Sequence, residues 1–432
     1  MIRKIKNFFL KTDLILYKKF GSNKSTKLLE NIKEAQIIFS HLNETGEEAK
    51  VRFVGGCVRK AIYGEIIDDI DLATILKPEE VKKKLTKKNI KVIDTGISHG
   101  TVTAILNRKK FEITTLRKDI LTDGRHANVE FTSNWDQDAS RRDFTINAIY
   151  ADIEGRIFDP LNGISDLKNG EIKFIGNPEE RIQEDYLRIL RFFRFSTQYS
   201  QSDYDQETIK SIKKHINGLN KISNERIFDE LKKIIKLNNF TNLFSNNISK
   251  EIILNIFPQF KYYERLKKFK NLSKNLKNKY DADLILSLLI NDRSNDYEYF
   301  CHKFKTSNSF KDRLHNISVN FDDLNSKNFY LEKNIKKLIY LLNKNQVIDL
   351  LLFSKCINNK IKDFEIEKLI NYIINYKIPK FPISGEFLKE HGYKSGKELG
   401  KKLKSLEEKW VENNFIIDKK EVKQYLEKFN KN

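Results

Sequence analysis

The chain has 432 residues, of which 39% are hydrophobic, and its formal net charge is +21, from 80 lysines and arginines against 59 aspartates and glutamates. This length allows two to four structural units, and the basic excess favours a nucleic-acid partner, although codon usage biased toward Lys and Asn would give the same excess. The three cysteines, Cys57, Cys301 and Cys356, exclude a disulfide framework and a cysteine-based zinc site, so we expect a reducing, cytoplasmic location.

The amino-terminal sequence begins with basic residues, but Lys11 and Asp13 interrupt its apolar stretch before it reaches the length of a signal peptide. No uncharged apolar window reaches the roughly 18 residues that a transmembrane helix needs. We therefore expect neither export nor membrane association. Residues 1–48 are expected to form an N-terminal helical segment.

Short β-prone runs separated by turn residues follow this segment, and Pro78 with the two acids after it predicts the start of a helix among them. After Pro178 only Pro258 interrupts the chain until Pro379, and the Leu-, Ile- and Lys-rich sequence between favours helices. The fold class expected is α+β, a mixed-sheet α/β head followed by an all-helical remainder. The predicted strands are Val51–Val54, Asp69–Leu76, Lys91–Asp94, Thr101–Leu106 and Phe111–Leu116.

A glycine pair, Gly55 and Gly56, ends the first predicted strand and is followed by Cys-Val-Arg. Such a turn brings backbone N–H groups close to a phosphate. Alternation on the next strand aims Asp69 and Asp71 at one face, where two carboxylates suit a pair of Mg²⁺ ions. This combination predicts nucleotidyl transfer. The alternative for either half alone is a polar turn with solvated aspartates.

Glu112 lies on a predicted strand that we expect beside the aspartate strand, which makes it a candidate third carboxylate; the alternative is an edge-strand Glu facing water. The segment from Lys118 to Trp135 lacks a clear period. It includes Asp119, Asp123, Gly124, Arg125 and His126, and is expected to form a mobile loop near the site, or else a solvated connection.

Residues 141–148 read Arg-Arg-Asp-Phe-Thr-Ile-Asn-Ala and are expected to open a helix. Arg141 and Arg142 can meet phosphate, and Asp143 can accept from a ribose hydroxyl. Pairing of arginine with aspartate inside the fold is the competing use.

Asp185, Arg188, Arg191 and Arg194 recur every three residues, which predicts one polar stripe along a helix whose other side is apolar. Asp185 can accept from the amino group shared by cytosine and adenine, and Arg188 can donate to the neighbouring ring acceptor. Such a pair rejects G and U. A solvated basic face is the alternative.

The ordered motifs Gly-Gly-x-Val-Arg, Asp-x-Asp-x-x-Thr, Arg-Arg-Asp-Phe-Thr-Ile-Asn-Ala and Glu-Asp-x-x-Arg, followed by Ser-Asn-Glu-Arg-Ile at 223–227, resemble the class II tRNA nucleotidyltransferase and bacterial poly(A) polymerase family. The resemblance covers roughly residues 50 to 235. It implies metal ligation by Asp69 and Asp71, with two Mg²⁺ ions and with CTP and ATP as substrates. The remaining implied roles are triphosphate contacts by Gly56 and Arg59, nucleotide contacts by Arg142, Asp143, Arg191 and Arg194, and base reading by Asp185 with Arg188.

The resemblance also implies a domain order and a partner. A head (49–155) is expected to precede a helical neck (156–245), a body (246–370) and a tail (371–432), with the body and tail holding the acceptor and T arm of tRNA. No protein partner is expected. One position departs from the family: Lys60 stands where an Asp usually follows Val-Arg, so it either weakens the orientation of Arg59 or itself meets phosphate.

Motif context separates activities within the family. His-Gly-Thr-Val at 99–102, Glu-Ile-Thr-Thr-Leu-Arg at 112–117 and the segment 381–388 resemble the CCA-adding members. No His-Asp dipeptide occurs, so the phosphohydrolase domain of some relatives is not expected. We therefore expect addition of C, C and A to the tRNA 3′ end, with poly(A) synthesis or a non-catalytic RNA-binding role as alternatives.

Overall fold

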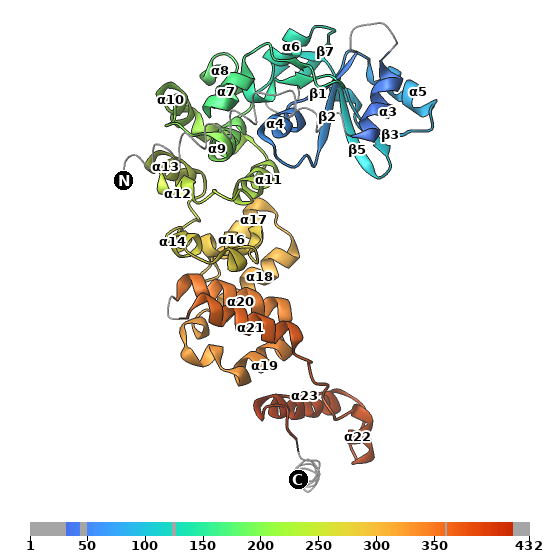
Figure 1. The fold of residues 1–432 in the computed structure, drawn as a ribbon. Helices are drawn as coiled ribbons and strands as arrows, with labels where there is room; N and C mark the ends of the chain where they lie inside the picture. Colours follow the sequence, from blue (N-terminus) through green and yellow to red (C-terminus); the bar gives the residue numbers. More distant parts are fainter. Residues whose placement is uncertain (1–31, 44–49, 123–126, 359–360, 418–432) are drawn as a thin grey trace. The chain divides into compact units, whose positions relative to one another are not determined.

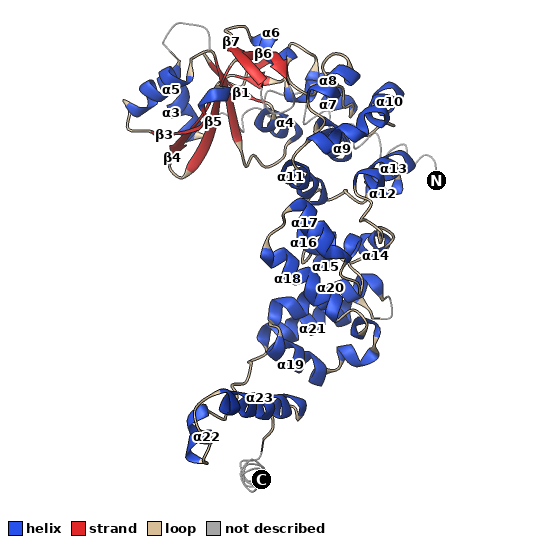
Figure 2. Ribbon diagram, turned by 180° about the vertical axis from the view of Figure 1, so that it is seen from behind, coloured by secondary structure: helices blue, strands red, loops and turns tan. Residues whose placement is uncertain are grey.

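The computed structural model describes residues 32–43, 50–122, 127–358 and 361–417, and the chain divides into two compact units, Met1–Ile252 and Ile253–Asn432. Figure 2 shows all the strands in the first unit, followed by helices alone. The expected α+β class, with a mixed sheet in the head and a helical remainder, is confirmed.

A seven-stranded mixed sheet of order β3-β4-β5-β2-β1-β8-β9 forms the core of the first unit. β2 and β5 run parallel, and the other neighbouring pairs run antiparallel. All five predicted strands are confirmed, and two short strands extend the sheet beyond β1. The strands of the sheet are β1 (Val51–Val54), β2 (Ile70–Thr74), β3 (Lys91–Gly96), β4 (Thr101–Leu106), β5 (Lys109–Thr115), β8 (Tyr150–Ala151) and β9 (Ile157–Phe158).

Burial alternates along β5, one of the central strands. On β5, Phe111, Ile113 and Thr115 are buried, whereas Glu112 between them is exposed. One face of the strand therefore packs into the core while the other carries its polar side chain outward. A separate two-stranded sheet consists of β6 (Arg117–Thr122) and β7 (Ala127–Phe131).

The head helices begin where the sequence supplies start signals. Pro78 opens α5 (Pro78–Thr86), and Glu80 accepts from the Lys77 N–H at 2.9 Å, as predicted for a helix with proline and acids in its first turn. α3 (Lys33–Leu42) buries an apolar face, and its Phe39 ring packs at a tilt against Phe53 of β1, with the ring centres 4.7 Å apart. Both helices lie beside the strands in Figure 1. The head also contains η1 (Ile97–His99), α4 (Gly56–Tyr63), α6 (Trp135–Ser140) and η2 (Thr145–Asn147).

Helices follow the sheet within the first unit, as the sequence predicts. The central one, α9 (Arg188–Tyr199), buries Phe192, Phe193 and Phe195, which pack against neighbouring aromatic rings. The others are α7 (Gly163–Asn169), α8 (Pro178–Glu184), α10 (Gln206–His215), η3 (Ile216–Lys221), α11 (Asn224–Ile235) and α12 (Asn242–Ser245); the unit boundary falls in α13 (Asn247–Ile256).

The described part of the second unit consists of helices joined by turns, as predicted. α16 is buried on nearly every side, and α20 buries most of its second half; a smaller apolar cluster of Ile383, Leu388 and Leu406 joins α22 to α23. None of the helices in the described ranges is long and apolar enough to cross a membrane. The elements are α14 (Arg265–Lys270), α15 (Lys274–Lys277), α16 (Ala282–Ile290), α17 (Asp296–Phe304), α18 (Asn308–Val319), η4 (Asp323–Asn325), η5 (Lys327–Tyr330), α19 (Glu332–Leu341), α20 (Lys344–Ile357), α21 (Asp363–Asn375), α22 (Gly385–Glu390) and α23 (Lys397–Glu412).

Candidate active site

The turn between β1 and α4 has the form of an anion cradle. Gly55 adopts φ +65° and ψ −114°, which favours glycine, and its N–H bonds the Ile149 carbonyl at 3.1 Å. A Cβ added there would lie 3.4 Å from the Asn147 carbonyl oxygen. α4 begins at Gly56, so its first N–H groups are available to a phosphate. The predicted glycine turn at the end of a strand is confirmed, and its contact with triphosphate stays a prediction.

One carboxylate lies next to this turn, and two others lie close to that carboxylate. Asp71 on β2 is the register partner of Glu112 on the parallel strand β5, and Asp69 directly precedes β2. A Cβ added to Gly56 would lie 4.0 Å from Asp71 Oδ2, so the helix start and the carboxylate approach each other closely. The expectation that the glutamate strand lies beside the aspartate strand is confirmed.

The surroundings of Asp71 disfavour a bare negative charge. Burial, followed by the negative charge of Glu112, raises the pKa of Asp71 to about 6, and Asp69 adds to this effect. A divalent cation would relieve this repulsion, and carboxylate oxygens are the ligands that Mg²⁺ prefers. Among the described residues, no group of three or more His, Cys, Asp or Glu side chains is already arranged to hold a metal ion. The arrangement therefore fits Mg²⁺ held by one or two carboxylates and completed by substrate phosphates.

Arg59 is buried behind the cradle and begins a polar network. Its Nη1 donates to Asn147 Oδ1, and its guanidinium lies 4.7 Å from the centre of the Phe195 ring. Asn147 Nδ2 donates to Asp143 Oδ1 at 2.8 Å, and Arg191 Nε donates to Asp143 Oδ2 at 2.7 Å. Within the described part of the chain, Arg59 Nε has no hydrogen-bond partner. The network thus links α4 to α9 and leaves one buried donor on Arg59.

Asp143 is engaged inside the fold. Although burial opposes its charge, Arg191 and the amide of Asn147 lower the pKa of Asp143 to about 2. Both of its carboxylate oxygens accept hydrogen bonds from the protein. The pairing of arginine with aspartate that the sequence left open is therefore present, and a ribose contact by Asp143 stays a prediction.

A buried aspartate that sequence reasoning missed holds the two predicted arginines. Asp138 accepts from Arg141 Nη2 at 2.6 Å, from Arg142 Nη2 at 2.9 Å and from Tyr150 OH at 2.7 Å. Burial alone would raise the pKa of Asp138, but the charges of Arg142 and Arg141 hold it well below its usual range. Arg142 Nη1 lies 3.7 Å from the position of a Cβ on Gly55, beside the cradle. Asp138 precedes Arg141 by three residues and Arg142 by four, and this spacing in the sequence could have indicated the ion pairs.

The expectation that residues 141–148 open a helix is wrong, since only the short turn η2 forms. Residues 143–145 instead pair with residues 173–175 in a short β-bridge. Thr145 N donates to Lys173 O at 3.1 Å, and Ile175 N donates to Asp143 O at 3.2 Å. Phe144 pairs with Phe174 in this bridge. Pairing with a distant segment therefore overrides the local helix signal.

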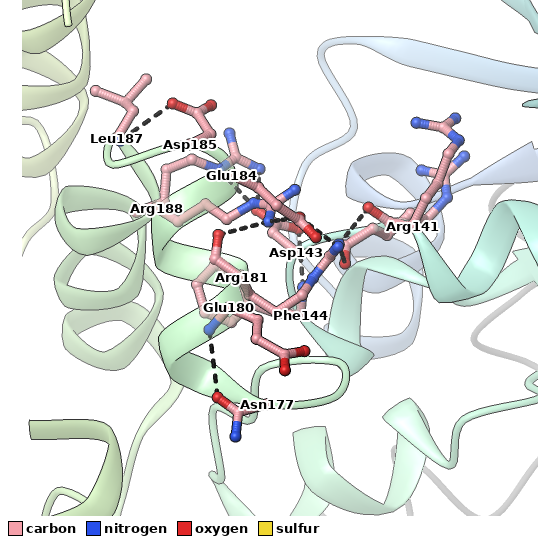
Figure 3. Close-up of polar contacts among 12 residues, drawn as sticks. Arg141, Asp143, Phe144, Asn177, Glu180, Arg181, Glu184, Asp185, Leu187 and Arg188 are labelled. Atoms are coloured by element: carbon pink, nitrogen blue, oxygen red, sulfur yellow. Dashed lines mark hydrogen bonds and ion pairs between the residues drawn. The ribbon is translucent and has the colours of Figure 1, made fainter. Parts of the chain in front are cut away.

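The predicted stripe of four residues is broken at its first member. α8 ends at Glu184, and Asp185 has extended backbone angles, φ −151° and ψ 102°, before α9 begins at Arg188. Asp185 Oδ2 accepts from Arg226 Nη2 at 2.8 Å, whereas Arg188 Nη1 donates to Glu184 Oε2 at 2.6 Å. Figure 3 shows Asp185 accepting from the backbone N–H of Leu187, whereas Arg188 donates to Glu184 and to the Arg181 carbonyl. Base reading by this pair stays a prediction.

The three remaining members, Arg188, Arg191 and Arg194, lie on α9 and form the arginine stripe. Arg191 is paired with Asp143, and Arg194 with Glu230 of α11. Arg194 also lies 4.1 Å from the centre of the Phe195 ring. The alternative of a solvated basic face is wrong, because all three arginine side chains are at most 30% exposed and ion-paired.

The expectation of a mobile loop from Lys118 to Trp135 is also wrong for the described residues of this segment, because β6 and β7 pair there as an antiparallel hairpin. A hairpin pairs its own backbone groups, so it needs no apolar period in its sequence. Asp123, Gly124, Arg125 and His126 lie outside the described residues, as does the side chain of Asp119.

Comparisons with known proteins show which family the chain resembles over most of its length. Residues 51–173 match the family described as the poly A polymerase head domain, and residues 203–264 match the probable RNA and SrmB-binding site of polymerase A. The chain is 34% identical to human CCA tRNA nucleotidyltransferase 1, mitochondrial, over 88% of this chain and 87% of that protein. It is 31% identical to the CCA-adding enzyme of Lactobacillus helveticus, over 94% and 99%.

Solved structures share the fold. The CCA-adding enzyme of Bacillus stearothermophilus in complex with CTP superposes with a TM-score of 0.71 at 23% identity, covering 92% of this chain and 97% of that one. The Thermotoga maritima CCA-adding enzyme complexed with tRNA gives 0.63 at 21% identity, covering 93% and 98%.

Proposed function

The chain belongs to the class II tRNA nucleotidyltransferase and poly(A) polymerase family, and we propose that it adds C, C and A to the 3′ end of tRNA without a template. The reaction uses CTP and ATP and releases pyrophosphate. The observation that carries this proposal is the close approach of Gly56 to Asp71, which brings a phosphate cradle next to the carboxylates. Relatives named for CCA addition match the chain almost from end to end.

Each proposed role follows from the position of the side chain. Gly55 shapes the turn, with its own N–H bonded to the Ile149 carbonyl, and the N–H groups from Gly56 onward, together with Arg59, bind the triphosphate. Asp69 and Asp71 hold two Mg²⁺ ions, and Glu112 adds a third negative charge beside them. When bound, such ions activate the attacking 3′ hydroxyl and stabilise the departing pyrophosphate.

Residues farther along the chain orient the nucleotide. Arg142 lies beside the cradle, and Asp138 fixes its guanidinium there. Asp143 contacts the ribose with the hydrogen-bond acceptor capacity that its carboxylate retains beyond its bonds within the protein. The arginine stripe on α9 faces the nucleotide. Asp185 and Arg188 read the base, which requires both to exchange part of their present pairing for the base edge.

The partner we propose is the acceptor and T arm of tRNA, held by the basic helical body and tail, with no protein partner required. A head at 49–155, a neck at 156–245, a body at 246–370 and a tail at 371–432 remain the proposed functional divisions. The cytoplasmic location stays a prediction, since the human and mouse relatives are named as mitochondrial proteins.

A product-length assay separates the alternatives. Purified protein is given ATP alone, with either a tRNA transcript ending in CC or an unstructured RNA primer. CCA addition predicts a single A on the tRNA and little extension of the primer. Long adenylate tails on both RNAs would instead indicate poly(A) synthesis, and binding without extension a non-catalytic relative.

A further inference from the structure

Lys60, which departs from the family pattern, forms an ion pair next to the catalytic strand. It follows Arg59 on α4, and its ammonium group contacts Asp68 Oδ1, with the lysine side chain 23% exposed and the aspartate side chain 64% exposed. The same Asp68 oxygen accepts a hydrogen bond from the backbone N–H of Asp69 at 3.0 Å. A continuous chain of contacts therefore runs from α4 to the backbone of the proposed metal ligand.

The backbone of Asp69 lies outside the strand ladder. The pairing of β2 with β1 and with β5 includes Ile70 to Thr74, and Asp69 lies just before it. Residues 64–69 connect α4 to β2. The start of this connection is held by Glu65, whose N–H donates to the Lys60 carbonyl at 2.8 Å and whose carboxylate accepts from Tyr199 OH at 3.1 Å. At its other end, Asp68 holds the connection by binding both the Lys60 ammonium group and Asp69 N.

We propose that Lys60 is a positioning residue that acts through Asp68 to hold Asp69 in the geometry for binding metal. This inference rests on the proposed function, because it takes Asp69 as a metal ligand. In this proposal the charge of Lys60 serves to hold Asp68 rather than to bind a phosphate. An aspartate at position 60, which is usual in the family, would place its carboxylate against that of Asp68. The two like charges would repel each other, so in this chain the residue at position 60 depends on the residue at position 68.

The test compares Lys60→Met, Lys60→Asp and the charge swap Lys60→Asp with Asp68→Lys. Mn²⁺ binding is measured by electron paramagnetic resonance with CTP present and tRNA absent, so that no turnover occurs. Removing a side chain that orients a metal ligand typically weakens metal affinity about 10–100-fold. We expect the Mn²⁺ affinity of Lys60→Asp to be weakened by a factor in that range and that of Lys60→Met to be weakened less. The Mn²⁺ affinity of the charge swap should recover to within roughly threefold of the wild type.

The Mg²⁺ dependence of transfer gives a second measurement. The half-saturating Mg²⁺ concentration should rise in Lys60→Asp in step with the Mn²⁺ result, while tRNA affinity stays unchanged. Lys87→Asp, an exposed position at the end of α5, is the charge-matched control and should behave as the wild type. The thermal unfolding midpoint of each variant identifies any that fail to fold. If a single variant does not fold, the Mn²⁺ affinity of the charge swap decides the role of Lys60.

Three outcomes would overturn the inference. They are wild-type Mn²⁺ affinity in Lys60→Asp, a charge swap no better than the single variant, or equal weakening of tRNA and metal binding. If the wild type transfers no nucleotide, the proposed function fails, whereas Mn²⁺ binding still decides the role of Lys60.

Discussion

At the level of single residues, the site depends on charges held in unequal surroundings. Asp71 lies among other carboxylates and resists ionisation, whereas Asp138 and Asp143 are held ionised by arginines. The first is suited to receive a cation, and the other two keep Arg142 and Arg191 in place. The aspartates thus divide into a proposed metal-binding set and a set that holds arginines in place, of which Asp143 is also the proposed ribose contact.

Replacing either proposed metal ligand should stop chemistry without releasing RNA. In Asp69→Asn and Asp71→Asn, an amide replaces a charged ligand, and we expect transfer to fall by about 10³-fold or more. Affinity for tRNA should change by less than about threefold, because phosphate contacts with basic helices dominate it. Transfer is measured under single-turnover conditions and tRNA binding by filter retention. Substantial turnover of either variant at saturating Mg²⁺ would contradict the metal assignment.

The raised pKa of Asp71 predicts the pH dependence of metal binding. Below about pH 6 a metal ion must displace a proton from Asp71, so Mn²⁺ affinity should fall as the pH drops from about 7 to about 5 and level off above about 7. Glu112→Gln removes a negative neighbour, so it should move the midpoint of this fall to lower pH even where it weakens binding overall. A midpoint that stays in place would mean that Glu112 does not act on Asp71.

At the level of elements, short-range patterns predicted strands and helices well, and failed where a distant segment intervened. β5 is set by alternation and α5 by start signals within their own sequence. The helix expected from Arg141 is absent because residues 143–145 bond to residues 173–175, and no local pattern signals that pairing. The sequence does not signal the break before α9, because the spacing of Asp185 matches the helical repeat that follows.

This break determines how the base-reading pair should respond to mutation. Asp185 is held by Arg226 and Arg188 by Glu184, so each side chain can be removed separately. Asp185→Ala should relax selection for C and A, raising misincorporation of U or G by roughly tenfold, as expected for a bidentate contact of about 1–3 kcal/mol. Arg188→Ala should lower incorporation of both correct nucleotides.

Single-nucleotide incorporation assays with all four NTPs measure this selectivity. Lys214→Ala, which removes an exposed ion pair of α10, serves as the control and should leave selectivity unchanged. Unaltered selectivity in Asp185→Ala would make the contacts of Asp185 purely structural.

At the level of the whole molecule, the sequence predicted a mixed-sheet head, a helical remainder and the strands that carry the carboxylates. It did not predict Asp138 or Asn147 as organisers of the site, because their roles depend on contacts across the folded unit. Nor did it predict the pairing of Lys60 with Asp68. Lysine and aspartate are common surface residues, and these two meet only because the connection between α4 and β2 brings them together.

The basic charge of the tail should appear in the salt dependence of tRNA binding. Lys401 and Lys404 are exposed on α23, and replacing both with alanine should weaken binding. The slope of log affinity against log salt should become shallower by roughly one for each phosphate that the tail no longer neutralises. Lys87 and Lys88, exposed at the end of α5, are the matched control pair. Equal effects of the two pairs would contradict a tRNA-binding role for the tail.

The central claim is that one active site adds three nucleotides in a fixed order. The most direct test gives the wild-type protein tRNA transcripts that end in the discriminator base, in C or in CC, with CTP and ATP together or singly, and sequences the product ends. We predict C, C and A on the first transcript, C and A on the second, and a single A on the third, with ATP alone extending only the last. Products that stop at CC, acquire only A, or grow into adenylate tails would contradict the claim.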